Sequence, residues 1–214
     1  MPEKDSSVLT APCRVFPPVR WQRVVLCLGS FAAWMSMGAL GLGVVLLGGR
    51  SLGLHWSLTD SVPAGLYRRS HAPLVRGQLI AFCLPSATAH FGWERGYLYR
   101  VPDISLLREC PHGYQPLLKP IVALAGDVVE LTPDTVRLNG HALTHSATVE
   151  QDSVGRPLPH LRWGSYLLAP GEVWVMSTFR ANSWDSRYFG PIRVASVIAT
   201  AEPVWVWQIT EAHP

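Results

Sequence analysis

Lys119 lies in an apolar segment, PLLKPIVALAGD (116–127), and is one of only two lysines in a chain with sixteen arginines. A buried charge costs several kcal/mol unless it is paired or neutralised. A desolvated lysine can lose its proton, whereas an arginine keeps its charge in a protein. The choice of lysine here indicates a site that needs a neutral amine. It suggests a general base and predicts a nucleophile elsewhere in the chain.

Ser61 is the candidate nucleophile. It lies in SLTDSVPAGLYR (57–68), where Pro63 and Gly65 predict a turn that can present a side chain outward. The chain has no G-x-S-x-G elbow, which argues against an α/β-hydrolase. It also has no H-E-x-x-H or C-x-x-C motif, and its eight histidines are scattered, so we expect neither a metal site nor a cofactor.

A long apolar segment precedes these motifs. Residues 24–49 carry no charge, and as a helix they would extend about 39 Å, enough to cross a bilayer core of about 30 Å. The alternative, a cleaved signal peptide, usually has an apolar region of only about 7–15 residues and a small-residue cleavage motif, which is missing here. The pattern predicts a retained transmembrane signal anchor over residues 21–50.

Charges on either side of this segment predict its orientation. Four basic residues precede it, and only Arg50 lies at its far edge. The positive-inside rule then places residues 1–20 in the cytoplasm and residues 51–214 on the other side of the membrane. Residues 1–20 are rich in proline, serine and charge, which is typical of a disordered segment.

The external part of the chain has the pattern of a mainly β fold. Short apolar runs alternate with Gly, Pro, Asn and Asp, which is typical of strands and turns and favours a small barrel-like or two-sheet fold. The predicted strands are 78–84, 117–124, 127–132, 135–140, 166–177 and 197–207, and 86–100 is the one ambiguous helical stretch. The net charge is only +3, and no basic cluster alternates with aromatics, so no nucleic-acid partner is expected.

Three motifs together resemble a known family. SVPAGLY (61–67), PLLKPIVALAGD and NSWDSRYFGP (182–191) occur in the order found in serine–lysine signal peptidases. The resemblance covers roughly residues 55–207 and is greatest to the conjugative-transfer, TraF-like branch, which processes pilins. Only one residue separates Ser61 from Pro63, a spacing shared with that branch, whereas general leader peptidases have two. The resemblance implies a signal-peptidase-like β fold with one N-terminal transmembrane helix.

The resemblance also implies a role for each site residue. Ser61 matches the nucleophile and Lys119 the general base, whose pKa must fall from about 10.4 by desolvation. The Ser61 backbone N–H and the Thr59 hydroxyl match the oxyanion donors, and Ser183 matches a serine that orients the lysine. Asp185 and Arg187 match a bracing acidic–basic pair. Taken singly, Ser61 could be a turn serine, Lys119 a strand-end lysine, and the pair a surface ion pair worth under about 1 kcal/mol.

The implied substrate is a membrane-anchored pilin precursor with small residues before the cleavage site, processed at the periplasmic face of a bacterial inner membrane for type IV secretion. Two alternatives remain: a general leader peptidase, and a membrane-anchored scaffold that has lost catalysis. Release of the acyl-enzyme by water or by a peptide amine, which would give a cyclic product, is also open.

The predicted membrane topology places the four cysteines in three different environments. Cys13 lies inside, Cys27 lies in the span, and Cys83 and Cys110 lie outside, where an oxidising compartment favours a disulfide. That bond would close a loop of about 28 residues, worth about 3.5 kcal/mol, and would tether residues 84–109 beside the strand that carries Lys119. The alternative is two buried free thiols.

Overall fold

The computed structural model describes residues 34–38, 40–41, 43, 48–49, 52–57, 61–101 and 109–207. It divides into two compact units, Met1–Gly48 and Gly49–Pro214. The residues described within 34–49 are helical, and among all described residues no helix is both long and apolar enough to cross a bilayer. Residues 1–20 and most of the predicted anchor over 21–50 lie outside the described residues, so both stay predictions.

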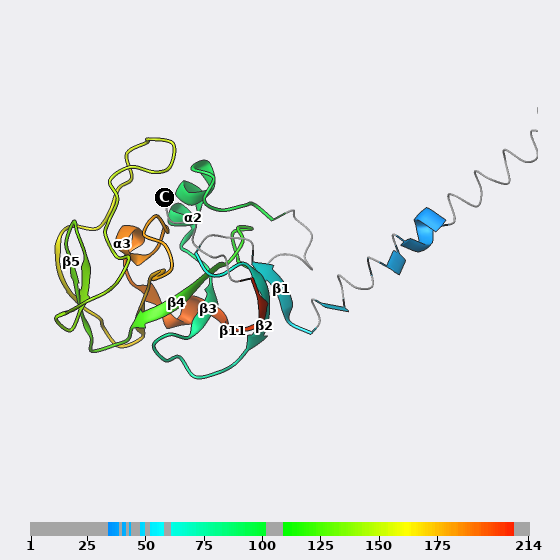
Figure 1. Cartoon of the computed structure of the whole chain (residues 1–214), viewed down its shortest axis with the longest axis horizontal. Coiled ribbons are helices and arrows are strands. Elements are labelled where there is room, and N and C mark those ends of the chain that lie inside the picture. The colour runs from blue at the N-terminus through cyan, green and yellow to red at the C-terminus, as the bar shows by residue number, and fades with distance from the viewer. Residues whose placement is uncertain are drawn as a thin grey trace, which may run out of the picture. The chain divides into compact units, whose positions relative to one another are not determined.

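The larger unit is built mainly of β-strands, as the sequence predicts (Figure 1). Seven strands form one antiparallel sheet in the order β1-β2-β11-β3-β4-β9-β10. Their bounds are β1 Leu54–Ser57, β2 Gly65–Ser70, β3 Leu79–Phe82, β4 Leu117–Ala123, β9 Glu172–Val175, β10 Ile192–Arg193 and β11 Val197–Val206. The sheet thus brings the beginning of the unit, β1 and β2, against its last strand, β11.

Four further strands form a second antiparallel sheet in the order β7-β6-β5-β8. They are β5 Val128–Leu131, β6 Val136–Leu138, β7 His141–Ala142 and β8 Gly164–Leu167. Asn139 and Gly140 connect β6 to β7, and both have positive φ, 50° and 85°. That backbone is what a tight hairpin turn requires, and Asn-Gly is the pair that adopts it at least cost.

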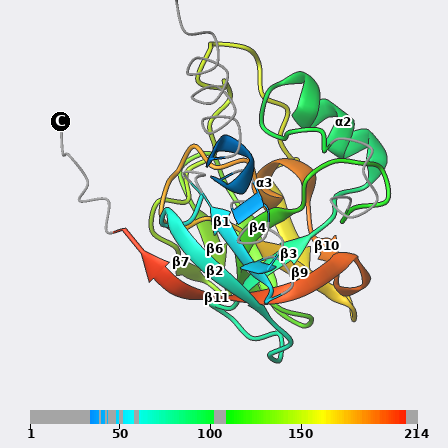
Figure 2. The ribbon, with the colours of Figure 1, turned by 90° about the vertical axis from the view of Figure 1, so that its right-hand side faces the viewer.

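The described residues of this unit also form two short helices and a turn of 3₁₀ helix: α2 Ser86–Glu94, α3 Ser186–Phe189 and η1 Val194–Ser196. α2 occupies the first part of the stretch that the sequence left ambiguous, and Figures 1 and 2 show it at the periphery, outside both sheets. α3 begins after Asp185, whose side chain accepts a hydrogen bond from the Arg187 backbone N–H at 3.3 Å and caps the helix.

Two hydrophobic clusters form the core, and β9 contributes to both. Val173 and Val175 pack with Ile80, Phe82 and Ile121 in the first cluster. Trp174 and Met176 pack in the second cluster, beneath the four-stranded sheet, with Val129, Leu131 and Val136. Because alternate side chains of a strand point to opposite faces, a strand covered on both faces reads as a continuous apolar run, as EVWVM does here.

The structure corrects two details of the predicted strands. Residues 166–177 do not form one strand, because Pro170 and Gly171 interrupt the run and send β8 and β9 to different sheets. Gly65 belongs to a strand, β2, and not only to a turn. A Cβ at position 65 would overlap the main-chain oxygen of Trp205 and lie 2.7 Å from Val206 Cα, so glycine permits β11 to approach there.

Candidate active site

Lys119 projects from the third position of β4 and is 2% exposed. Its side chain lies on the same face of the strand as Ile121 and Ala123, both fully buried, and its register partner in β3 is the fully buried Ile80. The alternation of a strand therefore carries the lysine into the interior instead of letting it reach solvent from a strand end.

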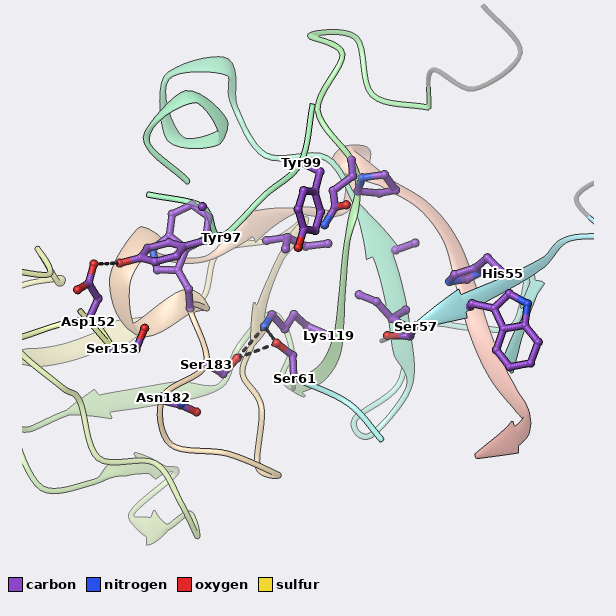
Figure 3. A pocket seen from close by; sticks show the side chains of 18 of the residues that line it. His55, Ser57, Ser61, Tyr97, Tyr99, Lys119, Asp152, Ser153, Asn182 and Ser183 are labelled. Atoms are coloured by element: carbon purple, nitrogen blue, oxygen red, sulfur yellow. Dashed lines mark hydrogen bonds between the residues drawn. The ribbon is translucent and has the colours of Figure 1, made fainter. Parts of the chain in front are cut away.

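The lysine amine meets two serine hydroxyls from distant segments (Figure 3). Nζ hydrogen-bonds to Oγ of Ser61 and lies 2.6 Å from Oγ of Ser183, and the two hydroxyl oxygens are 3.4 Å apart. Ser61 lies between β1 and β2, and Ser183 lies in the segment between β9 and α3. The fold thus brings together a hydroxyl nucleophile, an amine beside it, and a second hydroxyl that orients the amine.

Burial lowers the pKa of Lys119 to about 8, because desolvation penalises the ammonium form. The negative charge of Asp185 opposes this shift, and the positive charge of Arg187 adds to it. With that pKa, roughly one molecule in ten has a neutral amine at pH 7, against fewer than about one in a thousand for a free lysine. A hydroxyl within hydrogen-bonding distance of such an amine can be deprotonated by it.

Asp185 and Arg187 form an ion pair in which both side chains are fully buried. Nε and Nη2 of Arg187 lie 2.9 Å from Oδ1 and Oδ2 of Asp185, a two-pronged geometry that adds direction to the attraction. The guanidinium also donates to the carbonyl oxygens of Ala147 and of Ser183, the latter at 3.0 Å. The pair is therefore not a surface pair, and it holds the backbone of the serine that contacts Lys119.

A cleft of about 880 Å³ opens at this cluster and includes Ser61, Lys119 and Ser183 in its wall (Figure 3). Tyr97, Tyr99, Val149, Leu158 and Trp184 supply much of its apolar lining. Thr59 lies outside the described residues, so its predicted role at the oxyanion stays a prediction. Within the described ranges, no group of His, Cys, Asp or Glu side chains is arranged to hold a metal ion.

Comparison with known proteins identifies the family of this chain. A family model described as "Signal peptidase, peptidase S26" matches residues 32–207. The chain belongs to this family. It is 36% identical over 191 residues to a plasmid transfer protein TraF from Escherichia coli, across 88% of this chain and 99% of that protein. A conjugal transfer protein TraF from Agrobacterium fabrum is 34% identical over 172 residues, across 77% and 92%. The resemblance given by the three motifs is thereby confirmed.

A solved structure also aligns with this S26 family member. The crystal structure of a signal peptidase I from Enterococcus faecalis covers 61% of this chain and 97% of that chain, with 26% sequence identity and a TM-score of 0.33.

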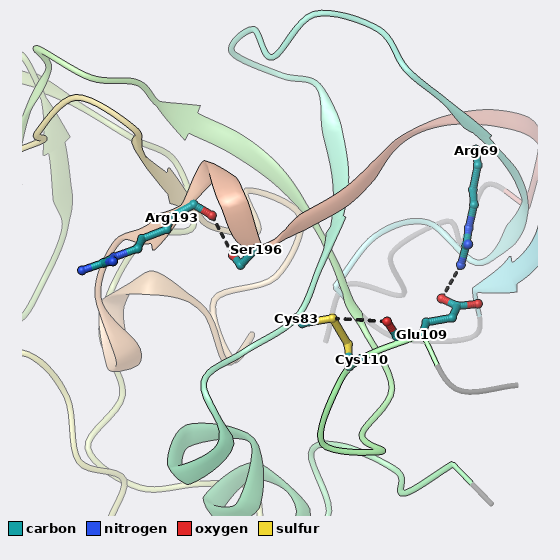
Figure 4. Close-up of a disulfide and its surroundings, with 6 residues drawn as sticks. All are labelled: Arg69, Cys83, Glu109, Cys110, Arg193 and Ser196. Atoms are coloured by element: carbon teal, nitrogen blue, oxygen red, sulfur yellow. Dashed lines mark hydrogen bonds and ion pairs between the residues drawn. A yellow bond between two sulfur atoms is a disulfide. The ribbon is translucent and has the colours of Figure 1, made fainter. Parts of the chain in front are cut away.

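Cys83 and Cys110 are joined by a disulfide in this S26 family member, with their Cα atoms 5.5 Å apart (Figure 4). Cys83 directly follows β3 and Cys110 precedes β4, so the bond closes the intervening segment at its base. Within that segment, Gly92 of α2 lies against Trp184, since a Cβ there would be 2.6 Å from the indole ring. The closed segment therefore packs on the neighbour of Ser183.

Ser177 is a site residue that no motif in the sequence indicates. It is fully buried two residues after the end of β9, and its hydroxyl donates to the main-chain oxygen of Ser61 at 2.7 Å. The serine follows an apolar strand and matches no catalytic motif, and its partner is 116 residues away.

Proposed function

We propose that this chain is a membrane-anchored serine endopeptidase whose Ser61–Lys119 dyad processes a membrane-anchored pilin precursor for conjugative transfer and type IV secretion. The observation that carries the proposal is the buried Lys119 amine, whose pKa is lowered to about 8, in contact with the Ser61 hydroxyl. Membership of the signal peptidase family supports peptidase chemistry, and relatives named for plasmid and conjugal transfer support the biological setting.

In the proposed reaction, the neutral Lys119 amine accepts the Ser61 proton as Oγ attacks the carbonyl carbon of the scissile peptide. Collapse of the tetrahedral intermediate breaks the C–N bond, and the Lys119 ammonium returns the proton to the leaving amine. The product is an ester between Ser61 and the substrate. In the intermediate, the Ser61 backbone N–H and the Thr59 hydroxyl are the proposed donors to the oxyanion.

Release of the ester needs a second nucleophile. Water gives a linear carboxylate product, with Lys119 taking the proton of the attacking water and returning it to Ser61. A terminal amine of the same substrate gives a cyclic peptide and loses its proton to Lys119 in the same way. The two products differ in mass by one water, so mass spectrometry of the processed substrate separates them.

A cluster of exposed tryptophan side chains supports the proposal that this enzyme works at a bilayer surface. Trp56 of β1 stacks on Trp207 with ring centres 5.7 Å apart, and Trp205 of β11 lies 4.4 Å from Trp207. The three side chains are 40–55% exposed, and the apolar side chains of Leu52 and Val204 are 71% and 53% exposed. Tryptophan is enriched at membrane–water interfaces, and Trp56 follows the predicted anchor by only a few residues in the sequence. The proposed location is the periplasmic face of the inner membrane.

Co-expression with candidate precursors tests this function. The wild-type protein should shorten a prepilin, and Ser61→Ala should leave it at full length while the variant retains its unfolding transition. Cleavage of secretory precursors in general, with no preference for the prepilin, would instead support a general leader peptidase. No cleavage of any precursor by the wild-type protein, with normal assembly of the transfer apparatus, would support the inactive scaffold.

A further inference from the structure

We propose that Ser177 is a positioning residue that fixes the backbone of the nucleophile, an inference that rests on the proposed function. Its hydroxyl donates to the main-chain oxygen of Ser61 at 2.7 Å, so it acts on the residue that would carry out the attack without touching its Oγ. The exposed fraction of Ser177 is zero. This hydroxyl therefore does not contact solvent, and it is not placed to attack a substrate as a second nucleophile.

All the hydrogen-bonding capacity of the Ser177 hydroxyl is in use. The backbone N–H groups of Phe179 and Arg180 donate to Oγ at 3.2 Å and 3.3 Å. A hydroxyl has one proton and two lone pairs, and the carbonyl oxygen of Ser61 can only accept. The single proton is therefore directed at Ser61, and the following turn of chain holds the hydroxyl in that orientation.

This contact fixes a different part of the nucleophile from the one that Lys119 holds. The Ser61 carbonyl defines the rotation of the peptide plane that follows Ser61, and the next residue, Val62, is 2% exposed. Lys119 and Ser183 hold the Oγ end of the side chain. The direction of attack is thus set by two attachments, one on the main chain of Ser61 and one on its side chain.

Both attachments lead back to the Asp185–Arg187 ion pair. The Ser177 backbone N–H donates to Oδ2 of Asp185 at 3.2 Å, and Nη2 of Arg187 donates to the Ser183 carbonyl at 3.0 Å. Because the ion pair is buried and bonded to both segments, it fixes the position of Ser177, which contacts the nucleophile, relative to that of Ser183, which contacts the base. Ser177 is the branch of this network that reaches the main chain of Ser61, whereas Ser183 reaches its hydroxyl.

The test is Ser177→Ala in the full-length, membrane-reconstituted protein, assayed on a peptide that the wild-type protein cleaves. Since misplacing a reacting group by about 1 Å can cost about a hundredfold in rate, we expect kcat to fall about 10- to 100-fold. KM should change less than about twofold, because the substrate-binding walls are untouched. The midpoint of the acidic limb of the pH profile should stay in place, whereas Ser183→Ala, which removes a partner of the base, should move it.

Ser146→Ala is the matched control. Ser146 is 2% exposed, its hydroxyl donates to the Leu143 carbonyl at 2.7 Å and accepts from the Val136 N–H at 2.9 Å, and it lies beside the four-stranded sheet. It should lower the unfolding temperature as Ser177→Ala does and leave kcat unchanged. Ser177→Cys, which retains a weak donor of similar size, should give an intermediate kcat if the alanine variant folds poorly.

Three results would overturn the inference: an unchanged kcat in Ser177→Ala, an equal loss of kcat in Ser146→Ala, or a shift of the acidic limb equal to that of Ser183→Ala. Each of these leaves peptidase activity in the wild-type protein and so refutes the positioning role alone. Failure of the wild-type protein to cleave any precursor or to form an acyl-enzyme would refute the proposed function, and this inference with it.

Discussion

Polar groups are buried in two regions of the larger unit, with different partners. Asp127, beside the four-stranded sheet, accepts hydrogen bonds from the Leu124 N–H, from Asn139 and from Arg76, whose side chain is 52% exposed. These bonds close turns and lower the pKa of Asp127, although its own desolvation opposes that shift. At the cleft, Lys119 is held by two hydroxyls and the nearby ion pair is fully buried.

Buried polar groups therefore have different consequences in these two regions. Around Asp127 every charge is neutralised locally, so each contact adds modestly to stability. Lys119, in contrast, is removed from water, and its amine hydrogen-bonds to two neutral hydroxyl groups. Its ammonium form is therefore destabilised, and the neutral, reactive amine becomes more populated. Variants of residues in the two regions, of the disulfide and of the exposed tryptophans test this difference.

Lys119→Arg should reduce cleavage by about a thousandfold or more, although it keeps the positive charge, because arginine cannot act as a base at neutral pH. Ser61→Ala should match it. The measurement is the initial rate of cleavage by purified protein in proteoliposomes, with thermal unfolding as the control for folding. Substantial activity in Lys119→Arg would exclude Lys119 as the base.

Arg187→Met should lower the free energy of unfolding by about 3–5 kcal/mol, because it leaves Asp185 charged, buried and unpaired. The matched variant at the other region is Arg76→Met, which should cost under about 1 kcal/mol, since Arg76 is half exposed and Asp127 keeps its other donors. Urea unfolding of both variants measures the difference. Equal losses would show that the two ion pairs do not differ as their burial indicates.

Removing the disulfide with Cys83→Ser and Cys110→Ser together should lower the free energy of unfolding by about 3 kcal/mol. Activity should also fall, because the segment that the bond closes packs through Gly92 on Trp184, next to Ser183. Unfolding of the oxidised and reduced wild-type protein provides the comparison, with thiol alkylation to count free cysteines. Full alkylation of Cys83 and Cys110 in unreduced native protein would contradict the bond.

Lys119→Met should stabilise the protein at pH 7 by about 2–3 kcal/mol, because the folded state no longer has to bury a lysine whose pKa is lowered from 10.5 to about 8. Between about pH 8 and 10.5 the unfolded wild-type chain binds more protons than the folded one, so wild-type stability gains with rising pH. The advantage of the variant should therefore shrink over that window. Unfolding at pH 7, 9 and 10.5 measures it, and a constant difference would refute the desolvation account.

Replacing Trp205 and Trp207 by serine, neither of which lines the cleft, should slow cleavage of a membrane-anchored precursor about fivefold and leave cleavage of a soluble peptide unchanged, because the rings would place the cleft at the bilayer surface. Trp163→Ser is the control, since Trp163 is 40% exposed, as Trp207 is, but lies before β8 of the other sheet. Equal slowing of both substrates would point to damage of the fold instead of loss of membrane contact.

Local pattern predicted much of this fold. β3, β4, β5, β6 and β11 all lie within the runs that the sequence marks as strands, since apolar side chains recur there between turn formers. The split of 166–177 was missed although Pro170 and Gly171 mark a turn in the sequence, and the assignment of each half to a different sheet cannot be seen in an apolar run. β2 was missed because Pro63 and Gly65 signal a turn, whereas its pairing with β11 is decided by contacts over 130 residues away in sequence.

Residue type and spacing alone indicate that one lysine lies in an apolar strand, that a serine precedes a proline-restricted turn, and that Ser183, Asp185 and Arg187 follow in one short motif. These are local properties. The folded chain is needed to see that Nζ of Lys119 contacts hydroxyls 58 and 64 residues away, and that the Ser177 hydroxyl donates to the Ser61 carbonyl. Such contacts depend on strand order and register, which local sequence does not encode, because the pairing of distant strands is settled by packing of the whole sheet.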